Sequence, residues 1–120
     1  MKLKPLLHVD RLFVVASMTR PLQVETGRDL ELIHRNQGYS SIACHFVIER
    51  SGVVHEGRPL NVPGALAGKL NAHSYQVCLL GGVNDALAPD ANFTKAQFRA
   101  LKQLAKRYTL PLDYAPAFPN

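Results

Sequence analysis

Three short apolar runs, each the length of a β-strand, constrain this chain more than any other feature. They cover residues 11–19 (RLFVVASMT), 43–50 (ACHFVIER) and 74–82 (SYQVCLLGG). Short runs of apolar and branched residues bounded by Pro, Ser or Gly are typical of buried strands. The second run continues through Ser51 and Gly52 into residues 53–58, which predicts a β-hairpin. The chain is therefore expected to build a sheet.

Two helical patterns lie between and after these runs. The first begins at Thr26, a suitable N-cap, and stops at Gly38. The second occupies residues 92–109, where Thr94 and Gln97 have the spacing of a capping box and apolar residues follow at helical intervals. Strands separated by helices, with a hairpin among them, predict an α/β fold: a central mixed β-sheet flanked by α-helices.

Two segments show no regular pattern. Residues 59–71 (PLNVPGALAGKLN) combine prolines and glycines, so we expect an irregular loop on the surface. Residues 110–120 (LPLDYAPAFPN) are rich in proline, and we expect no regular structure there.

Length and composition indicate a modest globular protein. The chain has 120 residues, of which 47% are hydrophobic, which suits one domain spanning 1–120. It lacks an apolar run of about 18 residues or more, so no membrane association is expected. The basic start, MKLKPLLHVDRLFVV, has no small-residue cleavage site for secretion. These features predict a cytoplasmic protein.

Charge and cysteine usage allow two further expectations. The net charge of +5 suits an acidic partner or nucleic acid, but five of the 14 basic residues fall in the second helical segment. Such a cluster is typical of a solvated helix face, and it lacks interleaved aromatic residues, so a nucleic-acid partner is not expected. Cys44 and Cys78 lie in apolar runs and are predicted to be buried, unpaired thiols.

Several segments together resemble one known family. They are residues 16–21 (ASMTRP), 33–65 (IHRNQGYSSIACHFVIERSGVVHEGRPLNVPGA), 71–85 (NAHSYQVCLLGGVND) and 91–104 (ANFTKAQFRALKQL). In order and spacing they are similar to the zinc-dependent N-acetylmuramoyl-L-alanine amidases of phage lysozyme type, whose fold is shared by peptidoglycan recognition proteins. The resemblance implies that fold, and an activity that cuts the amide between muramic acid and the first alanine of peptidoglycan.

The resemblance also implies a zinc ion held by two histidines and a cysteine or aspartate, but the matching positions here differ. Val15 stands at the first histidine, Cys44 at the tyrosine that assists the tetrahedral intermediate, and Leu66 at a cleft histidine. Tyr114 or Ala115 stands at the final ligand, and the segment that carries the preceding histidine is expected to be missing; Asp113, the nearest carboxylate, cannot build a site alone. Zinc hydrolysis needs three protein ligands and an open position. We therefore predict no catalytic residues, no metal site and no cofactor.

The adjacent Cys44 and His45 do not suggest a replacement centre. Neighbouring strand residues point to opposite faces of a sheet, so these two side chains are not expected to share one ion or form a nucleophile and base. His45 is interpreted as a satisfied strand histidine, and His34 matches a family histidine that is not a ligand.

Three functions remain open from the sequence. The first is a phage- or prophage-derived pseudoenzyme that binds and inhibits a host protein, such as RNA polymerase, which some members of the resembled family inhibit, or a defence component. The second is non-catalytic binding of a peptidoglycan fragment (muropeptide), and the third is residual amidase activity. A homodimer through an apolar surface at Val62, Leu66 and Leu70 is also considered. The candidate groove-binding residues are Arg20, Cys44, His45, Leu66, Lys69 and Asn71.

Overall fold

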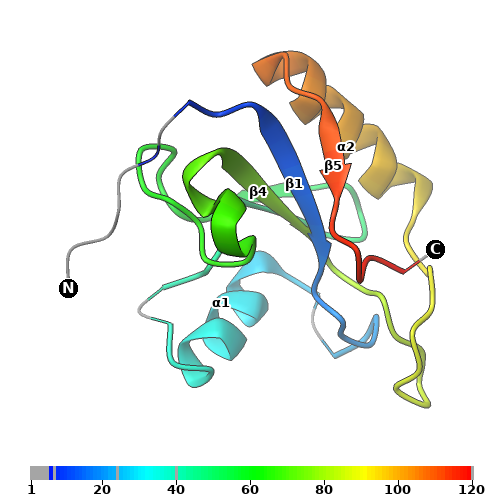
Figure 1. Ribbon diagram of the computed structural model, residues 1–120. Helices are drawn as coiled ribbons and strands as arrows, with labels where there is room; N and C mark the ends of the chain where they lie inside the picture. Colours follow the sequence, from blue (N-terminus) through cyan, green and yellow to red (C-terminus); the bar gives the residue numbers. More distant parts are fainter. Residues whose placement is uncertain (1–5, 7, 24, 40, 120) are drawn as a thin grey trace.

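The computed structural model describes residues 6, 8–23, 25–39 and 41–119. It contains a five-stranded sheet with one α-helix against each face (Figure 1). The elements in chain order are β1 (Arg11–Ala16), α1 (Gly27–Asn36), β2 (Phe46–Ile48), β3 (Val54–Glu56), the 3-10 helix η1 (Gly68–Ala72), β4 (Ser74–Leu79), α2 (Lys95–Tyr108) and β5 (Leu112–Tyr114). The predicted fold class, a mixed sheet flanked by helices, is confirmed.

The sheet is parallel except at one edge. Its strand order is β3-β2-β4-β1-β5, which places β4 at the centre. β1 runs parallel to both β4 and β5, and β2 runs parallel to β4. Only β2 and β3 are antiparallel, and they form the hairpin predicted around Ser51 and Gly52. Gly52 closes its turn with a φ of 92°, a left-handed conformation that glycine adopts without strain.

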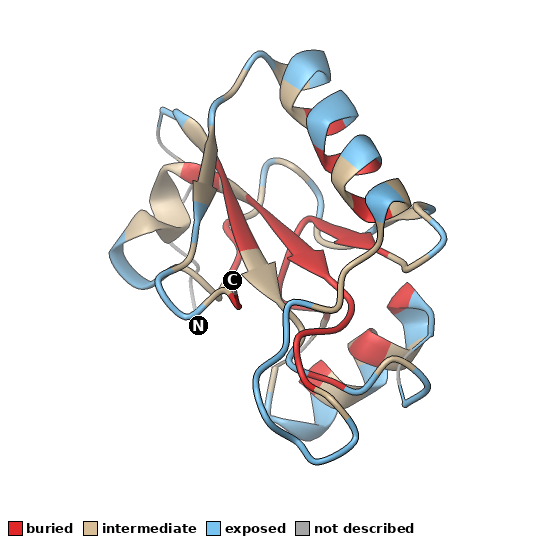
Figure 2. Cartoon of the chain, turned by 90° about the vertical axis from the view of Figure 1, so that its right-hand side faces the viewer, coloured by how far each residue is buried: buried red, intermediate tan, exposed pale blue. Residues whose placement is uncertain are grey.

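Each face of the sheet has its own apolar cluster. The α2-side cluster contains Leu12, Val14, Phe46, Ile48, Val77, Leu79, Ala100, Leu101 and Leu104. The α1-side cluster is smaller and contains Leu30, Ile42, Cys44, Val47, Cys78 and Leu80. Neighbouring residues of the central strands alternate between the two clusters, as the two-residue period of a strand requires. Figure 2 shows the buried strands in the centre and both helices with their exposed sides outward.

Both helices begin where the sequence predicts. Thr26 caps α1 by accepting from the backbone N–H of Asp29, whose carboxylate accepts from the N–H of Thr26 in return. Thr94 and Gln97 form the same reciprocal pair at the start of α2. These capping boxes satisfy N–H groups that the first helical turn leaves without partners. The first helix ends before Gly38, which has a φ of 100°.

The prediction of no regular structure after residue 110 is wrong. β5 pairs in parallel with β1 over the register Leu12 to Leu112 and Val14 to Tyr114. Proline removes only its own N–H, and Pro111 still offers its carbonyl, which accepts from the N–H of Leu12 at 2.9 Å. An edge strand of three residues therefore fits between two prolines.

The prediction for residues 59–71 is wrong in part. The segment contains most of η1, and Pro63 and Gly64 are buried, so it is not wholly a surface loop. A Cβ atom at Gly64 would lie 2.3 Å from Oε1 of Gln76, and this close approach explains why glycine is needed there.

Within the described residues, no helix is both long enough and apolar enough to cross a membrane. Residues 1–5, which belong to the segment searched for an export signal, lie outside the described residues.

Candidate functional site

Val15 lies near the carboxyl end of β1, where three parallel strands run side by side. It is in register with Cys78 of β4, and the N–H of Ala115, just after β5, donates to the carbonyl of Val14 at 2.9 Å. Sites in parallel sheets are commonly built at this end of the strands. The position that the sequence matched to a family ligand thus lies where a site is expected, but its side chain is aliphatic.

The structure brings together three positions that are far apart in the chain. Val15 and Leu66, both half-buried, pack against the α1-side cluster, of which Cys44 is a member. Cys44 itself has an exposed fraction of 0%. The positions at which the resembled family carries a zinc histidine, a catalytic tyrosine and a cleft histidine are therefore part of one apolar packing unit here.

The two cysteines are free and buried, as predicted. A hydrogen bond with the Cys44 thiol, together with burial, raises the pKa of Cys78 well above its usual value. A thiol acts as nucleophile or metal ligand only as the thiolate. Cys78 therefore stays protonated, and both cysteines serve as apolar packing.

Two buried histidines near the site form hydrogen bonds with the backbone. Nδ1 of His45 accepts from the N–H of Gln76 at 2.9 Å, and Nε2 then carries the proton that it donates to the carbonyl of Val62 at 2.6 Å. Nδ1 of His34 accepts from the N–H of Ala43 at 2.9 Å. Burial lowers the pKa of both rings, since it penalises the charged form. Both histidines hold segments of the fold together, as the sequence interpretation of His45 expected.

The candidate groove residues separate into two groups. Arg20 and Lys69 are exposed, and Leu66 and Asn71 are half-buried, so these four can face a ligand. The Cys44 and His45 side chains are both at most 1% exposed and do not reach the surface. Their part in groove binding has no support in the geometry and stays a prediction.

Gln76 is a site residue that the sequence did not single out. It is fully buried in β4, its Oε1 accepts from the N–H of Leu66 at 2.9 Å, and its Nε2 donates to Oδ1 of Asn71 at 2.8 Å. Asn71 Oδ1 also accepts from the N–H of Ala67 at 2.9 Å. One buried amide thus positions the loop that carries Leu66, and the signal for it was a glutamine inside an apolar strand run.

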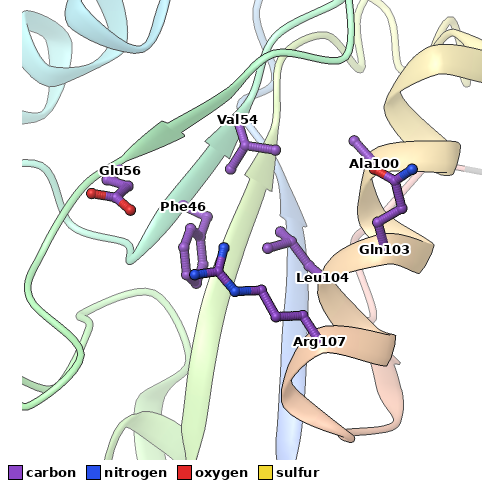
Figure 3. Close-up of a pocket in the computed structure, with 7 residues that line it drawn as sticks. All are labelled: Phe46, Val54, Glu56, Ala100, Gln103, Leu104 and Arg107. Carbon is purple, nitrogen blue, oxygen red and sulfur yellow. The ribbon is translucent and has the colours of Figure 1, made fainter.

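A pocket of about 300 Å³ lies on the opposite face of the sheet, between the hairpin and α2 (Figure 3). Its lining residues are Phe46, Val54, Glu56, Ala100, Gln103, Leu104 and Arg107. No local pattern in the sequence indicates it, because the hairpin ends at Glu56 and α2 begins only at Lys95.

The donor set does not fit zinc. Among the described residues, no group of three or more His, Cys, Asp or Glu side chains is placed to hold a metal ion. The side chains of Val15, Leu66 and Ala115 have no lone pairs to offer, and the Cys44 thiol is buried in the apolar cluster. Asp113 is paired with Arg11 at 2.9 Å, and burial raises the pKa of the Tyr114 phenol, which disfavours the phenolate that would bind a metal.

Comparison with known proteins agrees with the fold. The chain is 40% identical over 95 residues to the endolysin of Escherichia phage T7, covering 79% of this chain and 63% of that protein. It superposes on the N-acetylmuramoyl-L-alanine amidase LysC from Clostridium intestinale with a TM-score of 0.70 at 23% identity, covering 89% of this chain and 70% of LysC. Peptidoglycan recognition protein-LE, in complex with tracheal cytotoxin, gives a TM-score of 0.67 at 20% identity, covering 93% and 73%.

The chain spans 62–67% of the length of the four phage endolysins that it matches. A model of one family, N-acetylmuramoyl-L-alanine amidase, matches residues 12–116, nearly the whole of the sheet and both helices. The protein with the apolar cluster at Val15, Cys44 and Leu66 therefore belongs to the N-acetylmuramoyl-L-alanine amidase family.

Proposed function

We propose that this chain is a non-hydrolysing member of the amidase family, of phage or prophage origin, that acts by binding a host protein. One observation carries the proposal: Val15, Cys44 and Leu66 pack in or against one apolar cluster at the positions matched to family catalytic residues. An apolar cluster neither acidifies a water molecule nor polarises an amide carbonyl, which are the two tasks of zinc in hydrolysis.

Loss of hydrolysis is tested with the metal in excess. The purified protein should contain far less than one zinc ion per chain, and it should release no L-alanine peptide from muropeptide when zinc is added. The N-acetylmuramoyl-L-alanine amidase LysC from Clostridium intestinale, assayed in parallel, is the positive control. Release of peptide that a chelator abolishes would refute the proposal.

A retained binding role is favoured because the core of the described residues is intact while the positions matched to family site residues are apolar. Large-to-small or polar changes in a core cost stability, so a chain without selection would be expected to lose its core. Both clusters here are closed, and no buried side-chain nitrogen or oxygen in the described residues lacks a hydrogen-bond partner. The intact fold is consistent with a retained binding role in the cytoplasm.

Host RNA polymerase is the first partner to test, and a host-defence component is the second. The protein should inhibit transcription by the purified polymerase, or bind it saturably, at a stoichiometry of one chain per enzyme. A capture experiment from host lysate, with a heat-unfolded sample as control, covers the other partners. Absence of any saturable protein partner in both experiments would overturn this function.

Muropeptide binding is the second candidate, favoured by the similarity in fold to peptidoglycan recognition protein-LE, which was solved with a peptidoglycan fragment. Arg20 and Lys69 are exposed cations able to hold a peptide carboxylate. Calorimetry with monomeric muropeptide should show binding that the pair Arg20→Ala and Lys69→Ala weakens. No heat of binding, with no protein sedimenting with insoluble peptidoglycan, would exclude it.

A further inference from the structure

Helix α2 presents five cations to solvent and no anion. Its exposed basic residues are Lys95, Arg99, Lys102, Lys106 and Arg107. The helix contains no Asp or Glu between Lys95 and Tyr108. Every ion pair found among the described residues lies elsewhere, at Arg11 or Arg35. The positive charge of α2 is therefore not neutralised within the described part of the chain.

The spacing of these cations works against the helix. Lys95, Arg99, Lys102 and Lys106 follow one another at intervals of three or four residues, so their side chains lie in a single stripe. Like charges at this spacing destabilise a helix by a few tenths of a kcal/mol per pair, on the order of the gain from an opposite-charge pair. A partner that neutralises the stripe relieves this repulsion.

The pocket described above opens beside the stripe, on the neighbouring flank of the same helix. Ala100, Gln103, Leu104 and Arg107 face the hairpin side chains across it (Figure 3). Phe46, Ala100 and Leu104, all buried, form the apolar part of the pocket wall, and the rest of the wall is largely polar. Arg107 belongs both to the basic residues and to the pocket wall. The charged and apolar features therefore form one continuous surface.

We propose that the α2 stripe and this pocket together form a docking surface for an acidic polypeptide segment of a partner protein. Carboxylates of the segment pair with the stripe, and one aliphatic or aromatic side chain of the segment enters the pocket. The proposal rests on the proposed function, because it names the surface through which the chain would bind a protein. It places that surface on the face opposite Val15 and Leu66.

The chemistry of the surface favours a polypeptide over nucleic acid. Surfaces that bind single strands interleave cations with aromatic side chains that stack on bases. The stripe holds no aromatic residue, and the carboxylate of Glu56 lies at the pocket, where it repels a phosphate. An apolar side chain that enters the pocket brings no second negative charge to Glu56, and the carboxylates that flank it pair with the cations of the stripe.

The test uses the full chain and four fluorescent probes in anisotropy titrations at low salt. The first probe is a short glutamate peptide with one central phenylalanine, and the second has serine in place of that phenylalanine. The third is a lysine peptide with the phenylalanine, and the fourth a single-stranded oligonucleotide of the same charge as the first. The phenylalanine peptide should bind about tenfold or more tightly than the serine peptide, the ratio expected for burying one aromatic ring. The lysine peptide should not bind.

Two variants separate the charged and apolar contributions. The double variant Lys102→Glu with Lys106→Glu should weaken the binding of both glutamate peptides about tenfold or more, because it reverses the charge at two positions of the stripe. Gln103→Trp places a large side chain at an exposed position on the pocket wall. It should remove the preference for the phenylalanine peptide over the serine peptide, while the salt-dependent binding of both peptides to the stripe remains. The control is Arg28→Glu with Arg35→Glu, which makes the same charge change on α1 and should leave binding as it was. Circular dichroism confirms that each variant is folded.

The outcomes distinguish this proposal from the proposed function. Three results overturn the proposed docking surface. They are tighter binding of the oligonucleotide than of the phenylalanine peptide, equal binding of the two glutamate peptides, and no binding of any probe. If the Lys102→Glu and Lys106→Glu variant still inhibits or binds the host partner fully, the surface is wrong while the proposed function stands. If zinc-dependent hydrolysis appears, the proposed function fails whatever the peptides do.

Discussion

The two faces of the sheet differ in how their helices are attached. On the α2 side, Gln97 is fully buried, and its Nε2 donates to the carbonyl of Ile48 at 3.1 Å and to that of Leu80 at 2.9 Å. The amide therefore joins the helix to the ends of β2 and β4. On the α1 side, the equivalent capping residue is Asp29, whose carboxylate accepts, among the described residues, only from the N–H groups of Glu25 and Thr26 beside it. α1 is attached instead by single hydrogen bonds at its two ends: the N–H of Gly27 donates to Oε2 of Glu49 at 3.0 Å, and Nδ1 of His34 accepts from the N–H of Ala43 at 2.9 Å.

The contrast indicates on which face of the sheet polar residues can be replaced by apolar ones without loss of the fold. α2 is tied to the sheet by buried hydrogen bonds and a large cluster, so substitutions there disturb several elements at once. The α1 side has a smaller cluster with Val15 and Leu66 at its margin. Replacing polar site residues by apolar ones at such a margin adds packing without breaking the sheet. The fold therefore tolerates apolar side chains at the positions matched to family site residues.

The largest expected effect tests the attachment of α2. Gln97→Ala should lower the free energy of unfolding by about 2–4 kcal/mol, because it removes the side-chain partner of the Leu80 carbonyl and of the Thr94 N–H, and one of the two donors to the Ile48 carbonyl. Urea denaturation followed by circular dichroism measures the change. Gln103→Ala, an exposed glutamine on the same helix, should stay within about 0.5 kcal/mol of the parent. Similar values for both variants would mean that the buried amide does not anchor the helix.

The next largest effect tests whether Val15 contributes to stability as part of the apolar packing on the α1 side. Val15→His restores the family's residue type and should cost about 1–3 kcal/mol, because it places a polar ring against an apolar cluster. Zinc should not recover this loss, since the neighbouring Cys44 and Leu66 offer no further ligands. Thermal unfolding with and without zinc measures both points. A melting temperature that rises with zinc in the variant but not in the parent would show that a metal site survives.

A pH effect should follow from the two buried histidines. Burial lowers the pKa of His34 and of His45 below 6.5, so below this pH the unfolded chain takes up protons that the folded chain does not. Stability should therefore fall as pH drops below 6.5, by at most about 1.4 kcal/mol per pH unit for each histidine. Urea midpoints from pH 8 to pH 5 give the slope. A His8→Gln variant, changed at an exposed histidine, serves as the control and should show the same slope. A free energy of unfolding that does not change between pH 8 and pH 5 would contradict neutral His34 and His45 rings.

The smallest effect concerns the cap of α1. Asp29→Ala should cost about 0.5–1 kcal/mol, because the side chain is half-exposed and accepts only local N–H groups. The same urea measurement serves, with Glu31→Ala on the next turn of α1 as the control. A loss as large as that for Gln97→Ala would remove the difference between the two faces.

Much of the fold could be predicted because its signals are local. The capping boxes at Thr26 and Thr94, the hairpin turn at Gly52 and the alternating apolar residues each act within a few positions of the chain. The proline-rich end was misjudged because β5 forms only where β1 supplies a partner for it. A strand of three residues has no propensity strong enough to be recognised alone.

The sequence by itself determined both α-helices, strands β1 to β4, the family, and the residue types at the positions that the resemblance matches to family site residues. Only the tertiary structure decided that Val15, Cys44 and Leu66 share one apolar cluster, that Gln76 and Gln97 hold distant segments, and that a pocket lies beside the basic stripe of α2. The physical reason is the separation in sequence over which each interaction acts. Caps, turns and periodicity depend on neighbours in the chain, whereas burial, buried hydrogen bonds and pockets depend on residues that meet only when the sheet is assembled.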